Sequence, residues 1–340
     1  MSAARVTLEP GGRTFEVGPG ETILDAALRA GLALPHGCRE GACGSCRLRL
    51  LAGRVRYPAG VPPALADAAG EVIACQAVPE GEVALAAPEM PAEAPRRMPV
   101  RVERMERLAP DVMGLWLRPP MGAPLRHRAG QYLDVLLPGG RRRGFSIASA
   151  PGAGLIELHV RHRAGGAFTE HVFTRMRPKE LLRIEAPLGA FHLREGAGRP
   201  VLMVAGGTGF APLKAMIEHA LAAGLEVPVT LYWGARDRAG LYLHGLAEGW
   251  ARAHPGRIRY VPVLSEPRPE DAWAGRTGLV HEAVLADHAD LSGFDVYVAG
   301  PPAMVRAARA AFLARGLPAD RLFHDSFEPA ADARPPAAAR

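Results

Sequence analysis

Residues 38–46 read CREGACGSC, so three of the chain's four cysteines fall within one short stretch. Their spacing is C-x4-C-x2-C, and the fourth cysteine follows Cys46 after a gap of 28 residues. Four thiolates in this arrangement are the plant-type ligand set of a 2Fe–2S cluster. The glycines between the cysteines let the backbone wrap such a cluster, because only glycine reaches positive φ without strain. The stretch therefore predicts a metal site whose ligands are Cys38, Cys43, Cys46 and Cys75.

Other uses of cysteine fit this pattern less well. A zinc ribbon needs two C-x2-C knuckles, and the chain has one, from Cys43 to Cys46. A Rieske centre needs two histidine ligands; His36 is close in sequence, but no second histidine has a matching spacing. A disulfide framework would use the same cysteines and compete directly with the cluster. The iron–sulfur interpretation is favoured over these alternatives.

Length and composition limit what else the chain can be. Its 340 residues indicate two or three domains. The start lacks the apolar stretch of a secretory signal, and no apolar run approaches the ~18 residues of a membrane span, so we expect a cytoplasmic protein with no membrane span. The net charge of +6 is spread along the chain and only 6% of the residues are aromatic, which argues against a nucleic-acid partner. The basic surface is interpreted as solvated, with steering of an acidic redox partner as the alternative.

Residues 1–90 have the order of elements expected of a β-grasp ferredoxin domain. Alternation of apolar and polar residues predicts its strands, which fall at 5–8, 13–17, 47–50 and 72–74. A short helix lies between the second and third strands, with Thr22 as its N-cap and Gly31 at its end. The last of these strands delivers Cys75 to the cysteine loop.

Composition changes twice beyond this point. Residues 91–99 are interpreted as a semi-stiff, proline-containing linker. Residues 100–197 carry short alternating stretches separated by turns, which predict a small antiparallel β-barrel. Residues 198–328 alternate buried strands with helices, which predicts a parallel-sheet α/β domain. The barrel strands are expected at 100–103, 112–117, 132–137, 155–161 and 181–185, and the α/β strands at 200–205, 229–233, 258–264 and 294–299. The tail 329–340 is expected to be disordered.

Residues 206–212 read GGTGFAP and lie between the first buried α/β strand and a helix. Glycines at such a turn let the backbone approach a pyrophosphate, while the helix N-terminus supplies N–H donors and a positive dipole end. Pro212 suits the first helical turn. The motif is not G-x-G-x-x-G, and a structural strand-to-helix turn is the alternative explanation.

Two further motifs complete a pattern around this loop: residues 141–147 read RRRGFSI and residues 300–304 read GPPAM. With them, the whole chain resembles the ferredoxin–NAD(P)H reductase superfamily. It is most similar to three-part reductases that begin with a ferredoxin domain, namely reductase components of bacterial oxygenases and the CDP-6-deoxy-Δ3,4-glucoseen reductase group. The resemblance implies a β-grasp 2Fe–2S ferredoxin domain, an antiparallel barrel for FAD and a parallel α/β domain for NADH or NADPH.

The resemblance also implies roles for individual residues. Ser146 would lie near the flavin N5 and align hydride transfer, which makes it the candidate catalytic residue, and Arg143 would pair with a flavin phosphate. The other residues implied to bind the flavin are Phe145, His159, Val160, Arg161, Gly166, Phe168 and Thr169. Those implied to bind the nicotinamide nucleotide are Gly206, Gly207, Thr208, Gly209, Gly234, Arg236, Gly300, Pro301 and Met304.

The chain departs from the family pattern at two of these sites. Phe145 stands where the family usually has tyrosine, which keeps ring stacking and loses a hydroxyl group. Ala299 stands where the family commonly has cysteine, within an otherwise intact frame. Whether Phe327 or Glu328 covers the flavin is left open.

These parts predict an oxidoreductase that passes electrons from NAD(P)H through FAD and the cluster to a separate acceptor protein, either a deoxysugar dehydratase or an oxygenase component. The flavin is needed because nicotinamide gives up two electrons as hydride, whereas the cluster accepts one. The alternative is a non-enzymatic ferredoxin-type carrier on an inactive nucleotide-binding scaffold. An ordinary NAD dehydrogenase would leave the cluster unexplained. Arg236 and Arg238 could receive a 2′-phosphate and Asp237 a ribose hydroxyl; we favour NADH.

Overall fold

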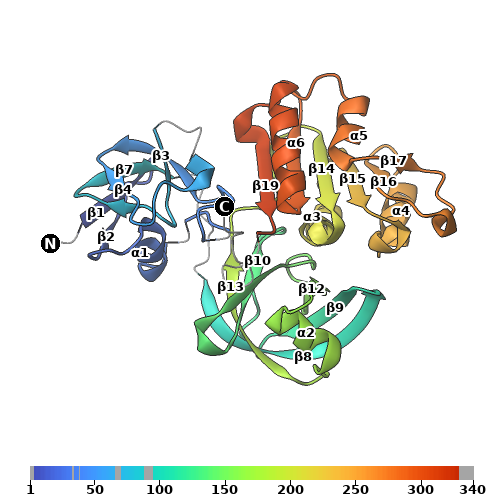
Figure 1. The fold of residues 1–340 in the computed structure, drawn as a ribbon, viewed down its shortest axis with the longest axis horizontal. Helices are drawn as coiled ribbons and strands as arrows, with labels where there is room; N and C mark the ends of the chain where they lie inside the picture. Colours follow the sequence, from blue (N-terminus) through green and yellow to red (C-terminus); the bar gives the residue numbers. More distant parts are fainter. Residues whose placement is uncertain (1–3, 33, 38, 66–69, 88–94, 329–340) are drawn as a thin grey trace, which may run out of the picture. The chain divides into compact units, whose positions relative to one another are not determined.

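A computed structural model describes residues 4–32, 34–37, 39–65, 70–87 and 95–328. The chain forms two compact units, each described here by itself (Figure 1). The first comprises Met1–Arg97, Glu185–Ala190 and Glu328–Arg340, and the second Met98–Ile184 and Phe191–Phe327. Part of the expected linker and the whole tail lie outside the described residues. Within the described residues, no helix is long and apolar enough to cross a membrane.

The first unit contains a five-stranded mixed sheet with the order β2-β1-β7-β3-β5. Its strands are β1 (Ala4–Glu9), β2 (Arg13–Val17), β3 (Arg47–Ala52), β5 (Glu71–Ile73) and β7 (Val83–Ala86). A separate pair joins β4 (Val55–Arg56) to β6 (Val78–Pro79), and one short 3₁₀ helix covers Pro63–Leu65. Strand β1 pairs with β2 antiparallel and with β7 parallel, as in a β-grasp sheet.

Helix α1 (Ile23–Arg29) packs on this sheet and begins where the sequence predicted. The Thr22 hydroxyl accepts a hydrogen bond from the Asp25 N–H at 3.2 Å and so satisfies one of the unpaired donors of the first turn. Gly31 has φ +76°, the left-handed conformation that commonly follows the end of a helix. The apolar face of α1 joins the strand side chains in one core, to which Cys46 and Cys75 also belong.

The second unit begins with the predicted antiparallel barrel, whose strand order is β11-β10-β13-β8-β9-β12. Its strands are β8 (Arg96–Ala109), β9 (Val112–Arg118), β10 (Tyr132–Leu136), β11 (Arg142–Ser146), β12 (Ile156–Arg161) and β13 (Leu181–Leu188). An antiparallel bridge between Ile147 and Leu158 joins the two edge strands and closes the barrel. Helix α2 (Ala167–Thr174) follows β12.

The rest of the second unit is a six-stranded sheet with the order β17-β16-β15-β14-β18-β19. All its neighbouring strands pair in parallel. The strands are β14 (Val201–Gly206), β15 (Val229–Ala235), β16 (Ile258–Leu264), β17 (Arg276–Thr277), β18 (Asp295–Gly300) and β19 (Leu322–Ser326). Their helices are α3 (Phe210–Ala222), α4 (His244–Ala253), α5 (Val280–Asp287) and α6 (Pro302–Ala314). One core packs α3 and α4 against one face, and a second core packs α5 and α6 against the other (Figure 1).

Strand β14 lies where the order of the sheet reverses, because the chain continues to β15 on one side and β18 lies on the other. Ligands of open parallel sheets bind beyond the carboxyl ends of the strands at such a reversal. The register aligns Ala205 of β14 with Trp233 of β15 and Ala299 of β18. The segments that follow these three strands therefore meet at one edge, although they are far apart in sequence.

Candidate functional site

The cysteine loop and the end of β5 bring three of the four predicted ligands, Cys43, Cys46 and Cys75, into one part of the first unit. Strands β3 and β5 pair so that Arg47 faces Ile73, which places Cys46 and Cys75 side by side at their ends. The contact with Cys75, followed by burial, raises the pKa of the Cys46 thiol well above its usual value. Cys43 accepts a hydrogen bond from the Ser45 N–H at 3.4 Å. Cys38 lies outside the described residues.

Glycines give this loop its shape. A Cβ atom on Gly37 would come 3.2 Å from the Cys43 sulfur and 3.1 Å from the Ser45 hydroxyl. Gly41 and Gly44 adopt φ of +72° and +75°, which side chains disfavour. The described residues, which leave out Cys38, contain no group of three ligating side chains that could hold a metal ion. A binuclear cluster instead needs four thiolates shared between two irons; the close pair Cys46 and Cys75 fits half of such a set.

At the carboxyl edge of the parallel sheet, the two glycine motifs interlock. A Cβ atom on Gly209 would lie 1.9 Å from the Ala299 carbonyl oxygen, and one on Gly206 would lie 2.5 Å from the Met304 sulfur. Gly300 has φ +146°, and a Cβ atom there would lie 2.9 Å from the Gly206 carbonyl oxygen. The loop after β14 and the loop after β18 thus pack backbone to backbone, which only glycine permits.

The neighbouring strand supports the same loop. The Trp233 indole N–H donates a hydrogen bond of 2.9 Å to the Gly207 carbonyl, and the Phe210 ring stacks on Trp233 with centroids 3.9 Å apart. Gly234 lies against Val280, which a Cβ atom would approach to 2.8 Å. The 3₁₀ turn Gly207–Gly209 leads directly into α3, and the Phe210 N–H already bonds to the Gly207 and Thr208 carbonyls. Free N–H donors for a ligand are therefore expected at the start of this turn, before α3.

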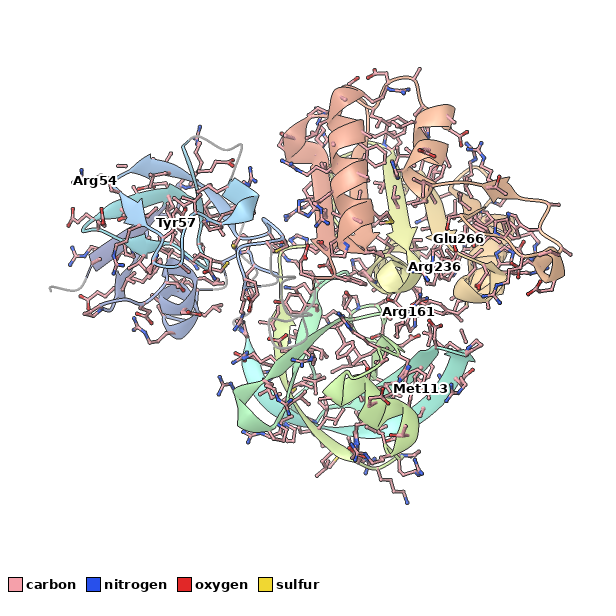
Figure 2. The ribbon with its side chains drawn as sticks, in the orientation of Figure 1. Arg54, Tyr57, Met113, Arg161, Arg236 and Glu266 are labelled. Atoms are coloured by element: carbon pink, nitrogen blue, oxygen red, sulfur yellow. The ribbon has the colours of Figure 1, made fainter. Side chains whose placement is uncertain are left out.

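Arg161 faces this loop from the barrel. The position of a Cβ atom on Gly207 is 3.4 Å from the Arg161 guanidinium carbon. The Arg161 Nε lies 3.5 Å from an Asp111 carboxylate oxygen, within ion-pair distance. Neither this Nε nor one buried terminal nitrogen of Arg161 makes a hydrogen bond. Figure 2 shows Arg161 between the barrel and α3. Arg161 is a partly exposed cation, and two buried nitrogens without acceptors beside a glycine turn have the chemistry of a phosphate site.

Strand β11 carries the predicted flavin residues along one edge of the barrel. Arg143 faces Val135 of β10 and is half-buried, and one of its terminal nitrogens donates to the Arg142 carbonyl at 2.8 Å. The Phe145 ring packs on Phe168 with centroids 5.3 Å apart. Phe168 belongs to α2, so the structure brings the second predicted flavin stretch beside the first.

Ser146 ends β11 and contacts a residue that the motif analysis did not identify. Its hydroxyl donates a hydrogen bond of 3.2 Å to Asp325 of β19. Burial raises the pKa of Asp325 to about 6, an effect that the Ser146 hydrogen bond partly offsets. Asp325 faces Ala299 in the β18–β19 register, so the carboxyl also adjoins the loop of the nucleotide motif. No local sequence signal marks Asp325; only the pairing of β19 with β18 brings it here.

The remaining predicted flavin residues differ in exposure. The His159 side chain is fully buried and contacts Glu157 and Tyr242, each at 2.9 Å. Val160 is fully buried too. Gly166 is the N-cap of α2, and the Thr169 hydroxyl donates to the Arg163 carbonyl at 3.0 Å. Of this stretch, the backbone at the start of α2 and the Arg161 side chain are therefore the groups best placed for phosphates.

Past β15, Arg236 is exposed, and its carbonyl accepts a hydrogen bond of 2.8 Å from the Glu266 N–H. Figure 2 shows these two residues close together beyond the strand ends. Asp237 accepts from the Gly240 N–H at 3.1 Å and from Arg268 at 2.6 Å. This corner presents the exposed cations Arg236, Arg238 and Arg268 beside one anchored carboxylate.

Comparison with known protein families divides the chain in the same way. Residues 6–80 match the 2Fe-2S iron-sulfur cluster binding domain, residues 99–193 the oxidoreductase FAD-binding domain and residues 203–310 the oxidoreductase NAD-binding domain. These matches assign a cluster, a flavin and a nicotinamide nucleotide to the three parts, in the predicted order.

Individual relatives cover nearly the whole chain. The CDP-6-deoxy-L-threo-D-glycero-4-hexulose-3-dehydrase reductase of Yersinia pestis is 39% identical over 329 residues, which span 95% of this chain and 98% of the relative. Reductase component 2 of terephthalate 1,2-dioxygenase from Comamonas sp. is 35% identical over 320 residues, which span 92% and 94%. The crystal structure of the Amycolatopsis cytochrome P450 reductase GcoB superimposes on this chain with a TM-score of 0.79 at 34% sequence identity. The aligned part covers 96% of this chain and 99% of the GcoB chain.

Proposed function

Because this chain belongs to the three-part ferredoxin–NAD(P)H reductase family, we propose that it oxidises NADH and delivers single electrons to a separate acceptor protein. As a member of this family it is an iron–sulfur flavoprotein oxidoreductase with a 2Fe–2S cluster, FAD and a nicotinamide nucleotide as cofactors. The choice of NADH, the individual site residues and the acceptor are the proposal. Full-length similarity to reductases argues against the alternative of a non-enzymatic carrier.

One observation carries the proposal: the interlocked loops at Gly206 and Gly300 adjoin the Ser146–Asp325 pair. The glycines let the two loops pack closely at the place where a dinucleotide would bind, and the turn that leads into α3 would offer N–H donors for its pyrophosphate. Arg161, which the resemblance assigned to the flavin, has its guanidinium beside Gly207 and would supply a positive charge to the nucleotide pyrophosphate. The nicotinamide end would then lie toward Ser146, since Asp325 faces Ala299 in the sheet register.

The residues along β11 and α2 fit an FAD molecule. Arg143 would hold a flavin phosphate, the first turn of α2 with Thr169 would hold the pyrophosphate, and the Phe145 ring would stack on the isoalloxazine. A bound flavin supplies the conversion of a two-electron hydride into single-electron steps. The Ser146 hydroxyl would orient the isoalloxazine ring, and its hydrogen bond to Asp325 holds that hydroxyl in place.

We propose NADH as the donor because Asp237 is anchored at the carboxyl edge. Its carboxylate already accepts from the Gly240 N–H and from Arg268 and retains capacity to accept from a ribose hydroxyl. A 2′-phosphate at the same place would meet this negative charge. Exposed Arg236 would then contact the adenosine end rather than select for a phosphate.

The acceptor is proposed to be a deoxysugar dehydratase or an oxygenase component, since relatives with full-length similarity are named as reductases of both kinds. The cytoplasmic location and the absence of a nucleic-acid partner stay predictions. An anaerobic titration of the purified protein, first with NADH and then separately with NADPH, tests the proposal by visible absorbance. We expect NADH to bleach both the flavin and the broad cluster bands. Flavin that neither nucleotide bleaches would overturn the proposal, and preferential bleaching by NADPH would overturn its nucleotide part.

A further inference from the structure

A buried lysine joins the barrel to the nucleotide-loop helix. The Lys214 side chain lies on α3 and is only 7% exposed. Its ammonium donates to Glu157 and Glu218, each at 2.9 Å, and to the Ala148 carbonyl at 3.2 Å. All three N–H groups of the ammonium therefore have acceptors. A fully paired charge inside a protein has a defined position, because any displacement leaves a donor or a carboxylate unsatisfied.

These contacts connect the elements that carry the proposed cofactor residues. Lys214 lies two residues beyond the GGTGFAP stretch and one helical turn from the start of α3, the helix whose start faces the nucleotide. Ala148 lies two residues beyond Ser146, and Glu157 lies on β12, the strand that ends at Arg161. The Lys214 side chain thus joins three pieces of backbone: the end of the flavin strand, the neighbouring barrel strand and the nucleotide helix.

The network continues through histidine and tyrosine. Glu157 also contacts His159 Nε2 at 2.9 Å, and His159 Nδ1 contacts the Tyr242 hydroxyl at 2.9 Å. Burial lowers the pKa of His159, so its ring is neutral at pH 7. Since a carboxylate only accepts, Nε2 carries the proton and Nδ1 accepts from Tyr242. The Tyr242 ring packs edge-on against Trp233, the residue that holds the Gly207 carbonyl.

The two carboxylates that pair with Lys214 differ in how strongly their surroundings stabilise the charged form. Burial by itself raises the pKa of Glu157, but the His159 hydrogen bond and the Lys214 charge outweigh it and lower that pKa below its usual value. The pKa of Glu218 is instead raised, chiefly by burial. Since Glu157 lies on β12 and Glu218 on α3 itself, the ion pair with Glu157, together with the Ala148 contact, links the helix to the barrel.

We propose that Lys214 is a positioning residue for hydride transfer: paired with Glu157, it fixes the nucleotide-loop helix on the flavin strands. The inference rests on the proposed function, in which α3 holds the nucleotide and β11 the flavin. A displacement of about 1 Å between donor and acceptor can slow such a reaction by about 10²-fold. Loss of the pair should accordingly lower the rate of the chemical step while both ligands still bind.

Two variants and one control separate positioning from folding. Lys214→Met keeps the apolar stem and leaves Glu157 buried without its cation, so it will lose stability as well. The double variant Lys214→Met with Glu157→Gln removes both charges of the pair and relieves the larger part of that cost, because the remaining Glu218 carboxylate is 30% exposed. Glu218→Gln is the matched control, because it removes the other carboxylate one helical turn away and leaves the Lys214–Glu157 pair intact.

Anaerobic rapid mixing with NADH gives the limiting rate of flavin reduction and the apparent Kd. We expect the double variant to keep the flavin content and Tm of the wild type and an apparent Kd within about 3-fold, while its limiting rate falls at least 10-fold. The limiting rate and the apparent Kd of Glu218→Gln should each stay within about 2-fold of the wild-type values. A double variant that recovers the wild-type rate together with its Tm would show a purely structural pair and overturn the proposal.

Hydrogen–deuterium exchange on the same full-length proteins supplies a measurement independent of turnover. Backbone amides at 203–217 and 156–161 should exchange faster in the double variant than in Glu218→Gln, because helix and barrel strand are no longer joined. Unchanged exchange in both segments would contradict the proposal. A wild type that NADH fails to reduce would overturn the proposed function, whereas the exchange comparison would still decide whether Lys214 couples the two elements.

Discussion

The Ser146 hydroxyl donates a hydrogen bond of 3.2 Å to Asp325, which joins the end of a barrel strand to the edge strand of the parallel sheet. Asp325 is partly buried, and the loss of solvent around its carboxyl raises its pKa to about 6. This carboxyl lies at the proposed hydride-transfer site, and its raised pKa brings its titration closer to physiological pH.

The raised pKa makes stability depend on pH in a defined direction. A carboxyl whose pKa is higher in the folded state favours folding below its unfolded pKa, and this contribution is lost as the pH rises through about 6. Each pKa unit corresponds to about 1.4 kcal/mol, so the contribution amounts to about 3 kcal/mol. Asp325→Asn should therefore flatten the stability profile between pH 4 and 7. Urea denaturation of variant and wild type across this range measures the difference, and parallel profiles would contradict the assignment.

Ser146→Ala should slow hydride transfer without releasing the flavin. The change removes the hydroxyl at the reacting end and leaves the partly buried Asp325 carboxyl without its partner, for which about 1–3 kcal/mol is typical. We expect the limiting rate of flavin reduction by NADH to fall about 10- to 100-fold, with flavin content unchanged. Ser292→Ala, at a surface turn capped by Asp290, serves as the control. An unaltered rate would remove Ser146 from the catalytic assignment.

Gly209→Ala should disrupt the nucleotide loop. The new Cβ atom would lie 1.9 Å from the Ala299 carbonyl oxygen, so the loops after β14 and β18 must move apart. Such backbone overlaps cost several kcal/mol, and we expect a lower Tm together with at least 10-fold weaker NADH binding. Gly245→Ala is the matched control, because nothing lies within 4 Å of its Cβ position in helix α4. Calorimetry measures the Tm and titration measures the Kd of NADH for both variants. Equal values for Gly209→Ala and Gly245→Ala would contradict the prediction.

The sequence predicts those parts of the site whose residues are close together in the chain, and it does not predict contacts between distant residues. The cysteine loop, the Thr22 cap and the GGTGFAP turn are local patterns, and the structure confirms the turn and the cap where they were predicted. The Ser146–Asp325 pair joins residues 179 positions apart and depends on the register of an edge strand that alternation did not reveal. Lys214 and Glu157 read as an ordinary helical lysine and strand glutamate until the fold buries them together.

Arg143→Ala should weaken flavin binding. In the proposed site the guanidinium pairs with a flavin phosphate, and a charge-assisted hydrogen bond contributes about 1.5–3 kcal/mol. We expect a 10- to 100-fold increase in the Kd of FAD, seen as flavin lost during gel filtration and restored by added FAD. Arg141→Ala is the control, because the Arg141 side chain is exposed and donates to the nearby Pro138 carbonyl at 3.3 Å. Equal flavin retention in both variants would place the phosphate elsewhere.

Cys43→Ala should separate the two halves of the electron path. Four thiolates hold a 2Fe–2S cluster, so the variant should lose the cluster's iron and its broad visible absorption. Flavin reduction by NADH takes place on the barrel and the parallel sheet, so NADH–dye activity should remain within about 2-fold. Cytochrome c reduction needs the one-electron carrier and should fall at least 10-fold. Ser45→Ala keeps all four thiols and serves as the control. Equal loss of dye and cytochrome activities in Cys43→Ala would contradict a linear relay from flavin to cluster.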